Sequence, residues 1–145
     1  MRDAGGKSEG LIRLEIDGRP VSVPEGSTIL DAAKILGIEI PTLCYSPLIE
    51  PYAACRICSV EVEFPGGKKR IVTACNYPVW EGIKVYSDNA KVRRIRRMIV
   101  EMLLARCSSV AVLKDLATKY GLEEVRLEKQ EEKCDASVHD VRVRC

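Results

Sequence analysis

Four cysteines in one stretch of this chain have the type and spacing that suit metal chemistry. Cys44, Cys55, Cys58 and Cys75 follow the pattern C-x10-C-x2-C-x16-C. Thiolates bind iron and zinc, and a cluster of two irons and two sulfides takes four of them, two on each iron. Cys55 and Cys58 share one short turn, whereas the other two cysteines come from separate parts of the chain. The spacing therefore predicts an iron–sulfur site built by three backbone segments.

Zinc is the alternative occupant of four such thiolates. Structural zinc sites usually combine two C-x2-C pairs, or add histidines to one pair. This stretch contains one C-x2-C pair and no histidine. Small residues around it, such as Ala53 and Ala54, would leave backbone N–H groups available to charged sulfur atoms. Both observations favour the iron–sulfur site over a zinc site.

The sequence around these cysteines resembles the [2Fe–2S] ferredoxin domain of the large peripheral subunit of NADH dehydrogenase (complex I), of iron-only hydrogenases and of formate dehydrogenase-associated subunits. The similar segments are residues 40–47 (IPTLCYSP), 53–62 (AACRICSVEV) and 70–75 (RIVTAC), and the resemblance covers roughly residues 11–104. The chain departs from the pattern at Ala53, where the family usually has glycine. The resemblance implies one [2Fe–2S] cluster, with Cys44 and Cys55 on one iron and Cys58 and Cys75 on the other.

Composition limits the class of protein. A chain of 145 residues has room for one core with an appendage, and with only 5% aromatic residues that core must be aliphatic. Residues 1–10 contain no apolar run, so we expect a flexible start without an export signal, and no segment has the length of a membrane span. Seven cysteines, an odd number, without an export signal predict a reducing, cytoplasmic location.

Residues 11–87 have the pattern of a small α+β domain. Alternating residues predict strands at 11–16 and 19–23 around the turn Asp17-Gly18, and Thr28-x-x-Asp31 predicts a capped helix that Gly37 ends. Residues 38–58 are expected to form a long ordered loop around the cluster, followed by a hairpin at 60–64 and 70–74 and a strand at 83–86. The pattern supports α+β, and the resemblance implies the β-grasp (ubiquitin-like) fold.

Residues 88–121 predict a helical hairpin, expected to lie against the ferredoxin domain. Ser87 or Asp88 could cap the first helix, which runs to about Arg106, and Ser108 or Ser109 the second, which Gly121 ends. The apolar faces would contain Val92, Ile95, Ile99, Met102 and Leu103, then Val112, Leu113, Leu116, Ala117 and Tyr120. Cys107 is expected to be a buried thiol. Because Cys107 is the only cysteine or histidine between Leu104 and Cys134, the [4Fe–4S] site found here in the NADH dehydrogenase subunit is predicted to be absent.

Charge and aromatic residues suggest where partners bind. Residues 91–121 contain eight basic and two acidic side chains. We expect Lys91, Arg93, Arg94, Arg96 and Arg97 to point to solvent and to offer a docking surface for an acidic partner subunit. Nucleic acid is less favoured because stacking aromatic residues are missing. Trp80 is interpreted as a core or interface aromatic rather than an electron relay.

Residues 122–145 predict a charged tail that is mobile or ordered by a partner. Its end resembles the start of a C-x2-C-x2-C-x3-C cluster motif, with Ser137 and Asp140 at the second and third ligand positions and Cys145 one residue late. The tail is therefore interpreted as a degenerate motif. A second site built from Cys134, His139, Asp140 and Cys145 stays open as an alternative.

The function implied by the resemblance is one-electron transfer. The chain would be a small subunit of a larger oxidoreductase complex similar to NADH dehydrogenase, hydrogenase, formate dehydrogenase or heterodisulfide reductase. It would not be an enzyme on its own, because flavin- or [4Fe–4S]-containing partner subunits would supply catalysis. The alternatives are a structural or assembly module with a non-redox metal and, less favoured, a DNA-binding redox sensor. Reduction potential, electron donor and electron acceptor depend on surroundings that sequence does not specify.

Overall fold

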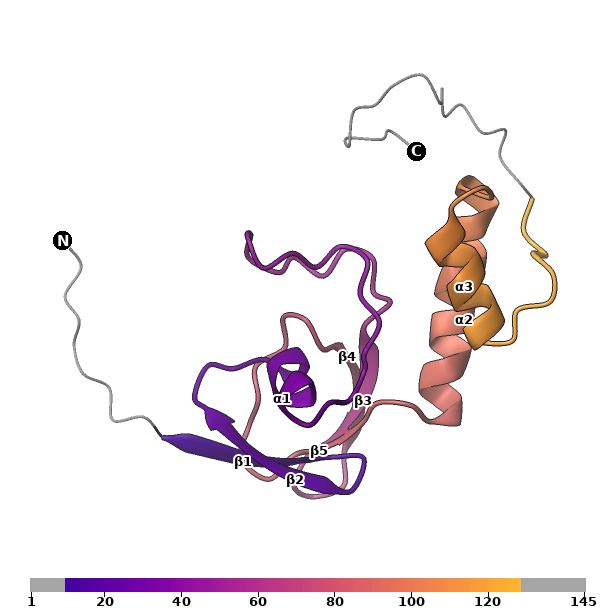
Figure 1. Cartoon of the computed structure of the whole chain (residues 1–145). Helices are drawn as coiled ribbons and strands as arrows, with labels where there is room; N and C mark the ends of the chain where they lie inside the picture. The colour runs from indigo at the N-terminus through magenta and orange to yellow at the C-terminus, as the bar shows by residue number, and fades with distance from the viewer. Residues whose placement is uncertain (1–9, 129–145) are drawn as a thin grey trace. The chain divides into compact units, whose positions relative to one another are not determined.

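The chain folds into a mixed sheet and three helices in a computed structural model that describes residues 10–128 (Figure 1). In order, the elements are β1 (Leu11–Ile16), β2 (Arg19–Pro24), α1 (Ile29–Ile35), β3 (Ser59–Glu63), β4 (Lys69–Thr73), β5 (Lys84–Tyr86), α2 (Ala90–Arg106) and α3 (Ala111–Lys119). This confirms the predicted α+β class. The chain divides after Val92 into two compact units, which are described separately.

The first unit contains a five-stranded sheet with the order β2-β1-β5-β3-β4. β5 occupies the centre, parallel to β1 and antiparallel to β3. The β1–β2 turn has positive φ at Asp17 (50°) and Gly18 (78°), as a tight two-residue hairpin turn requires. The predicted hairpins and last strand are therefore confirmed. Their apolar side chains form one core with α1, which includes Ile16, Val60 and Val85.

Helix α1 has the predicted beginning and end. Thr28 Oγ1 accepts a hydrogen bond from the backbone N–H of Asp31 (3.2 Å), and Asp31 Oδ2 accepts one from the N–H of Thr28 (3.0 Å). This reciprocal pair is a capping box. At the other end Gly37 has φ 68°, and the N–H of Ile38 reaches the carbonyl of Ala33 at 2.9 Å. The helix is thus closed before the loop that contains Cys44.

Strand β3 departs from the expected alternation of buried and exposed residues. Glu61 is 7% exposed, and its carboxylate accepts hydrogen bonds from Asn89 Nδ2 and Lys91 Nζ, both at 2.8 Å. The hydrogen bond from Lys91 holds the pKa of Glu61 below its ordinary value.

The N-terminus of α2 is capped by Asn89. Asn89 Oδ1 accepts a hydrogen bond from the backbone N–H of Val92 at 2.9 Å. The expected cap, Ser87 or Asp88, was wrong, because Ser87 donates its N–H and hydroxyl to the Asp17 carboxylate.

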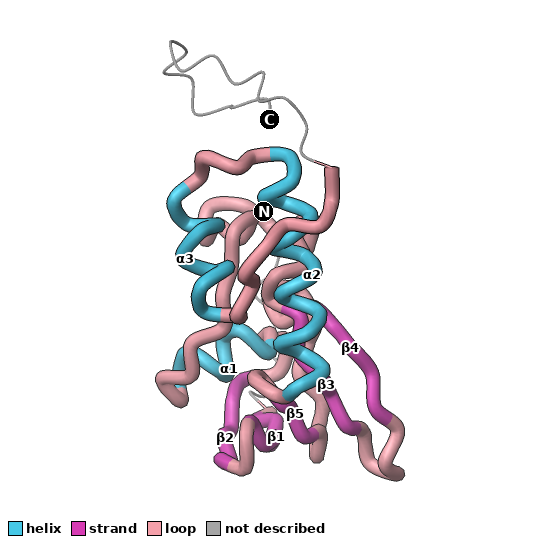
Figure 2. The backbone as a smooth tube through the Cα atoms, turned by 90° about the vertical axis from the view of Figure 1, so that its right-hand side faces the viewer, coloured by secondary structure: helices cyan, strands magenta, loops and turns pink. Residues whose placement is uncertain are grey.

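In the second unit α2 and α3 pack as antiparallel neighbours (Figure 2). Near the start of α2, Arg93 Nη2 donates to the carbonyl of Lys119 and Arg96 Nη1 to the hydroxyl of Tyr120, each at 3.2 Å. Arg96 is 2% exposed, so its predicted position in solvent was wrong. The buried face of α2 continues with Ile99, Val100 and Leu104.

Other expectations for the helices need correction at single residues. Met102 is 47% and Val112 48% exposed, so neither belongs to the buried faces where they were predicted. Val110, not Ser108 or Ser109, is the N-cap of α3, with no side-chain cap bond. Cys107 is half-buried rather than buried. Gly121, with φ 67°, follows the last turn of α3 as expected.

The segment after α3 returns to α2. The backbone N–H, Nε and Nη2 of Arg126 all donate to the Glu101 carboxylate, at 2.8, 3.0 and 2.7 Å. Glu101 is 2% exposed. These hydrogen bonds lower the pKa of Glu101 to about 2. In the described part of the tail, which was predicted to be mobile or ordered by a partner, Arg126 is held on α2. The cysteine-containing end of the tail and residues 1–9 of the predicted flexible start lie outside the described residues.

This ion pair predicts a specific acid sensitivity. The folded-state pKa of Glu101 lies below its ordinary value of 4.5, so the stability that the pair contributes is complete above pH 4.5 and is lost as the pH falls toward 2. We expect the difference in unfolding midpoint between wild type and Glu101→Gln to shrink over this range. Unfolding curves of both proteins at pH 7 and at pH 3, followed by the circular dichroism signal of the helices, measure this difference. A difference that is equal at both pH values would contradict the role given to the pair.

Candidate metal centre

Three backbone segments of the first unit carry the four cysteines. Cys44 lies in the long loop between α1 and β3, which extends away from the sheet in Figure 1. Cys55 and Cys58 lie at the end of that loop, and Cys75 follows β4. The N–H of Ala74 donates to the carbonyl of Cys58 at 3.1 Å, which holds the beginning of β3 beside the end of β4. The hairpin thus fixes Cys58 and Cys75 next to each other.

The thiols form two pairs. The N–H of Cys55 donates to Cys44 Sγ at 3.5 Å, and the hydrogen bond from the N–H of Ala74 to the carbonyl of Cys58 places Cys75 beside Cys58. Cys58 and Cys75 are each 1% exposed, whereas Cys44 and Cys55 are half-buried. Within residues 10–128, no three His, Cys, Asp or Glu side chains surround one position for a metal ion. A two-plus-two arrangement matches a cluster in which each iron takes two cysteines.

The protonation of the thiols reflects burial and their mutual proximity. Burial raises the pKa of Cys75 to about 12, together with the hydrogen bond to Cys58 and the charges of Cys44 and Cys55. Burial also raises the pKa of Cys44. All four sulfur atoms therefore lie in one electrostatic neighbourhood. Because metals bind thiolates, loading this site releases protons.

Backbone N–H groups surround the outer pair of sulfur atoms. Burial acts to raise the pKa of Cys55, but hydrogen bonds from the N–H groups of Ile57, Cys44 and Leu43 and from the Cys44 thiol lower it below its ordinary value. The N–H groups of Cys55 and Ala54 point to Cys44 in the same way. Such donors stabilise negative sulfur, which is what a thiolate-ligated cluster needs from its loop. The donor set of this structure fits a [2Fe–2S] cluster.

The loop makes these turns through two residues with left-handed backbone. Ala53 has φ 52° and Arg56 has φ 60°. Glycine adopts this conformation at lower cost than any residue with a side chain. The structure thus gives a physical reason why glycine suits the position of Ala53. In this chain alanine adopts the left-handed conformation at position 53.

Substitutions at Ala53 test this turn. Ala53→Gly should change the free energy of unfolding by less than about 1 kcal/mol, because relief of strain offsets the lost methyl group and the added chain entropy. Ala53→Val should cost about 2–4 kcal/mol, since a β-branched residue at positive φ in a buried site is strained and crowded. Urea unfolding of the cluster-containing protein measures both. Equal stability of the two variants would show that the turn does not depend on this φ.

Ile57 is a residue of the site that the sequence analysis did not single out. It lies between Cys55 and Cys58, and its side chain is fully buried. The signal was a large apolar residue inside a C-x2-C pair, in a loop where Leu48, Ile49 and Tyr52 are exposed. Ile57 therefore anchors the ligand loop by its side chain while its N–H faces a sulfur atom.

Comparisons with known proteins identify the family to which the chain is similar. The sequence profile of the 2Fe-2S iron-sulfur cluster binding domain matches residues 9–90. NADPH-Fe(3+) oxidoreductase subunit alpha of Geobacter sulfurreducens is 49% identical over 94 residues, covering 65% of this chain and 11% of the relative. NADP-reducing hydrogenase subunit HndD of Solidesulfovibrio fructosivorans is 40% identical over 128 residues, covering 79% and 21%. The chain thus spans about a fifth or less of the length of these curated relatives.

A solved structure is also similar. A chain from the crystal structure of an NAD+-reducing [NiFe]-hydrogenase in the H2-reduced state superposes with a TM-score of 0.71 at 29% identity, over 87% of this chain and 56% of the other. Separately, none of the helices within residues 10–128 has the length and apolar character needed to cross a membrane. Because the profile covers more than half of the sequence, the chain belongs to the family of 2Fe-2S iron-sulfur cluster binding domains.

Proposed function

We propose that this chain transfers single electrons through one [2Fe–2S] cluster held by Cys44, Cys55, Cys58 and Cys75, as part of a larger oxidoreductase complex. The placing of the thiols in two pairs, Cys44 with Cys55 and Cys58 with Cys75, carries this proposal. When bound, such a cluster accepts and releases one electron at a time. The family membership and the names of the relatives, which are subunits of oxidoreductases and of a hydrogenase, support it.

Within this proposal the two pairs of thiols have different tasks. Cys58 and Cys75 are almost fully buried, so water is kept away from these two inner ligands. Cys44 and Cys55 are half-buried, so their side of the cluster lies nearer to an approaching partner. The N–H groups of the loop stabilise the negative sulfur atoms without any net charge of their own. Arg56, which is exposed, adds a positive charge at the same turn.

The finer organisation is also a proposal. Residues 11–87 would form a β-grasp ferredoxin domain, residues 88–121 a helical extension and residues 122–145 a charged tail. Catalysis would belong to partner subunits that contain flavin or [4Fe–4S] clusters, so the chain would not be an enzyme by itself. The five described cysteines, Cys44, Cys55, Cys58, Cys75 and Cys107, are free thiols, which suits a reducing location such as the cytoplasm.

Electron transfer is tested by following the oxidation state of the cluster in the native complex during turnover. The [2Fe–2S] centre is expected to become reduced when the substrate of the complex is added and to be reoxidised by the acceptor, at the rate of turnover. Rapid freezing followed by EPR records both steps. A centre that keeps one oxidation state throughout turnover would make the chain a structural or assembly module instead.

A further inference from the structure

The single tryptophan and the single phenylalanine of this chain line the same hollow at its surface. Trp80 is 56% exposed, so its predicted place in a core was wrong and only the interface interpretation stays open. Phe64 is half-buried against the edge of the core. The rings of Trp80 and Phe64 are therefore both in contact with solvent, although the chain contains few aromatic residues. Tryptophan in such a position is typical of protein interfaces.

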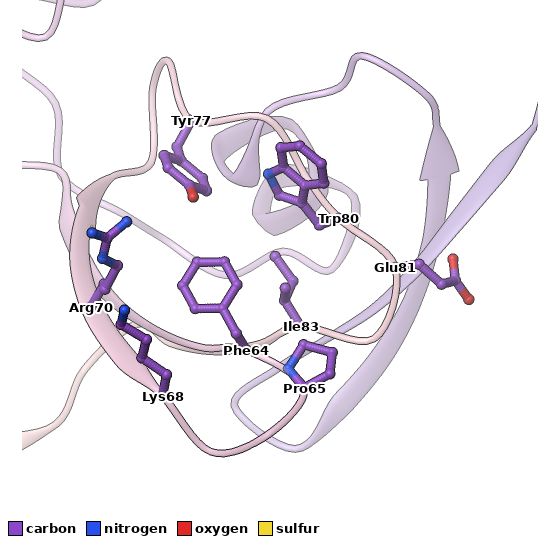
Figure 3. Close-up of a pocket in the computed structure, with 8 residues that line it drawn as sticks. All are labelled: Phe64, Pro65, Lys68, Arg70, Tyr77, Trp80, Glu81 and Ile83. Carbon is purple, nitrogen blue, oxygen red and sulfur yellow. The ribbon is translucent and has the colours of Figure 1, made fainter.

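The two rings border a hollow of about 460 Å³ in the first unit (Figure 3). Tyr77 stands beside Trp80 at its rim, and Phe64 and Ile83 lie between them and the hairpin turn at Pro65. The hollow is large enough for an aromatic or branched side chain. Because its Trp80 wall is more than half exposed, it suits one protruding side chain better than a small molecule that must be enclosed.

Charge around the hollow is one-sided. Lys68 and Arg70 are exposed and lie together on the side opposite Trp80 (Figure 3). Glu81, the acidic residue of the lining, turns away, and its Oε2 accepts a hydrogen bond from the N–H of Arg13 at 2.8 Å. The apolar hollow therefore has a basic rim. Its complement is an apolar side chain with carboxylates beside it.

The basic rim lies along a free sheet edge. Arg70 belongs to β4, which ends the strand order, so within residues 10–128 one backbone edge of β4 pairs with no other strand. An extended peptide can add to such an edge through main-chain hydrogen bonds. A hollow for a side chain next to an open strand edge favours an extended protein segment as the occupant.

We propose that this hollow is a docking site for an acidic, extended segment of a partner protein. The segment inserts an apolar side chain among Phe64, Tyr77 and Trp80, and its carboxylates pair with Lys68 and Arg70. This inference rests on the proposed function only in assuming a partner subunit, and its test measures binding without electron transfer.

The test uses the full chain with its cluster and two sets of short synthetic peptides. In one set a Phe, Leu or Ile is flanked by Asp and Glu, and in the matched set by Asn and Gln. Because Trp80 is the only tryptophan, a change in its emission reports the hollow directly. The acidic set should bind about tenfold tighter or more, with affinity that falls with salt.

Variants locate the binding. Trp80→Ala should weaken the acidic peptides about thirtyfold when binding is followed by calorimetry, and Arg70→Glu should abolish their preference over the neutral set. Trp80→Phe should recover part of the affinity. Arg19→Glu, the same charge reversal on the other edge strand β2, should leave binding unchanged.

Several outcomes would overturn the inference. Failure of both peptide sets to bind, or acidic peptides that bind Trp80→Ala and Arg70→Glu as well as wild type, would exclude docking here. Saturable quenching of Trp80 by ADP or NADH without peptide binding would assign the hollow to a nucleotide instead. Reduction of the cluster by dithionite in each variant, followed by EPR, shows that the fold is intact and keeps this result separate from the proposed electron transfer.

Discussion

Replacing Cys58 by alanine is expected to leave the chain without its iron–sulfur cluster. Cys58 is 1% exposed and lies beside Cys75, so solvent water has little access to its position as a replacement ligand. Losing one of four thiolates leaves one iron of a two-iron cluster with a single protein ligand. Visible absorption, iron and sulfide content and the EPR signal of the reduced protein should all fall to the level of cluster-free protein.

Cys107→Ala is the matched control for this variant. Cys107 lies in the second unit, directly after α2, and is half-buried. The Cys107→Ala variant also lacks one thiol, but its absorption, iron content and EPR signal should be the same as those of wild type. If Cys107→Ala loses the cluster as completely as Cys58→Ala, the proposed ligand set is wrong.

Ile57→Ala is expected to have the second largest effect. The side chain is fully buried, and removing it leaves a cavity that costs about 2–5 kcal/mol. Because the backbone N–H of Ile57 helps to lower the pKa of Cys55, movement of this backbone also makes the thiolate of a proposed ligand less stable. The cluster should still assemble, but it should be lost faster and at lower urea concentration than in wild type.

Ile49→Ala provides the comparison within the same loop. Ile49 is 53% exposed, and surface substitutions of this kind usually change stability by less than about 0.5 kcal/mol. Loss of visible absorption in the presence of an iron chelator, as a function of urea, measures both variants. Equal rates for Ile57→Ala and Ile49→Ala would mean that burial of Ile57 does not support the site.

The elements predicted correctly are those specified by neighbouring residues. Asp17-Gly18 forms the expected turn because positive φ at two successive positions is a local property, and the Thr28–Asp31 capping box is closed within one helical turn. The order and approximate bounds of the strands and helices follow from alternation and helical spacing in the same way. The parallel pairing of β1 with β5 involves distant segments and was not predicted.

The errors concern polar residues whose partners lie far away in the sequence. Arg96 was expected in solvent, but it is buried and donates to Tyr120. Glu101 is also buried, and its carboxylate accepts hydrogen bonds from Arg126, whose position the spacing did not indicate. Glu61 breaks the alternation of β3 because Asn89 and Lys91 satisfy its charge. The spacing of apolar residues predicts which side chains could be buried. It does not predict which charged side chains have a hydrogen-bond partner in the core.

The ligand set of the site stays a prediction. Four cysteines could be identified from spacing, and the structure brings them together in two pairs. Their assignment to individual irons came from the family resemblance and stays a prediction. The packing of the helical extension on the ferredoxin domain also stays a prediction. The alternative site at Cys134, His139, Asp140 and Cys145 lies outside the described residues.

Metal analysis of the full chain, purified without oxygen, tests the central claim most directly. Two irons and two sulfides per chain should be found, with visible absorption and, after reduction, a rhombic EPR signal of one unpaired electron per chain. Colourless protein that contains one zinc per chain, with neither sulfide nor an EPR signal, would contradict the account.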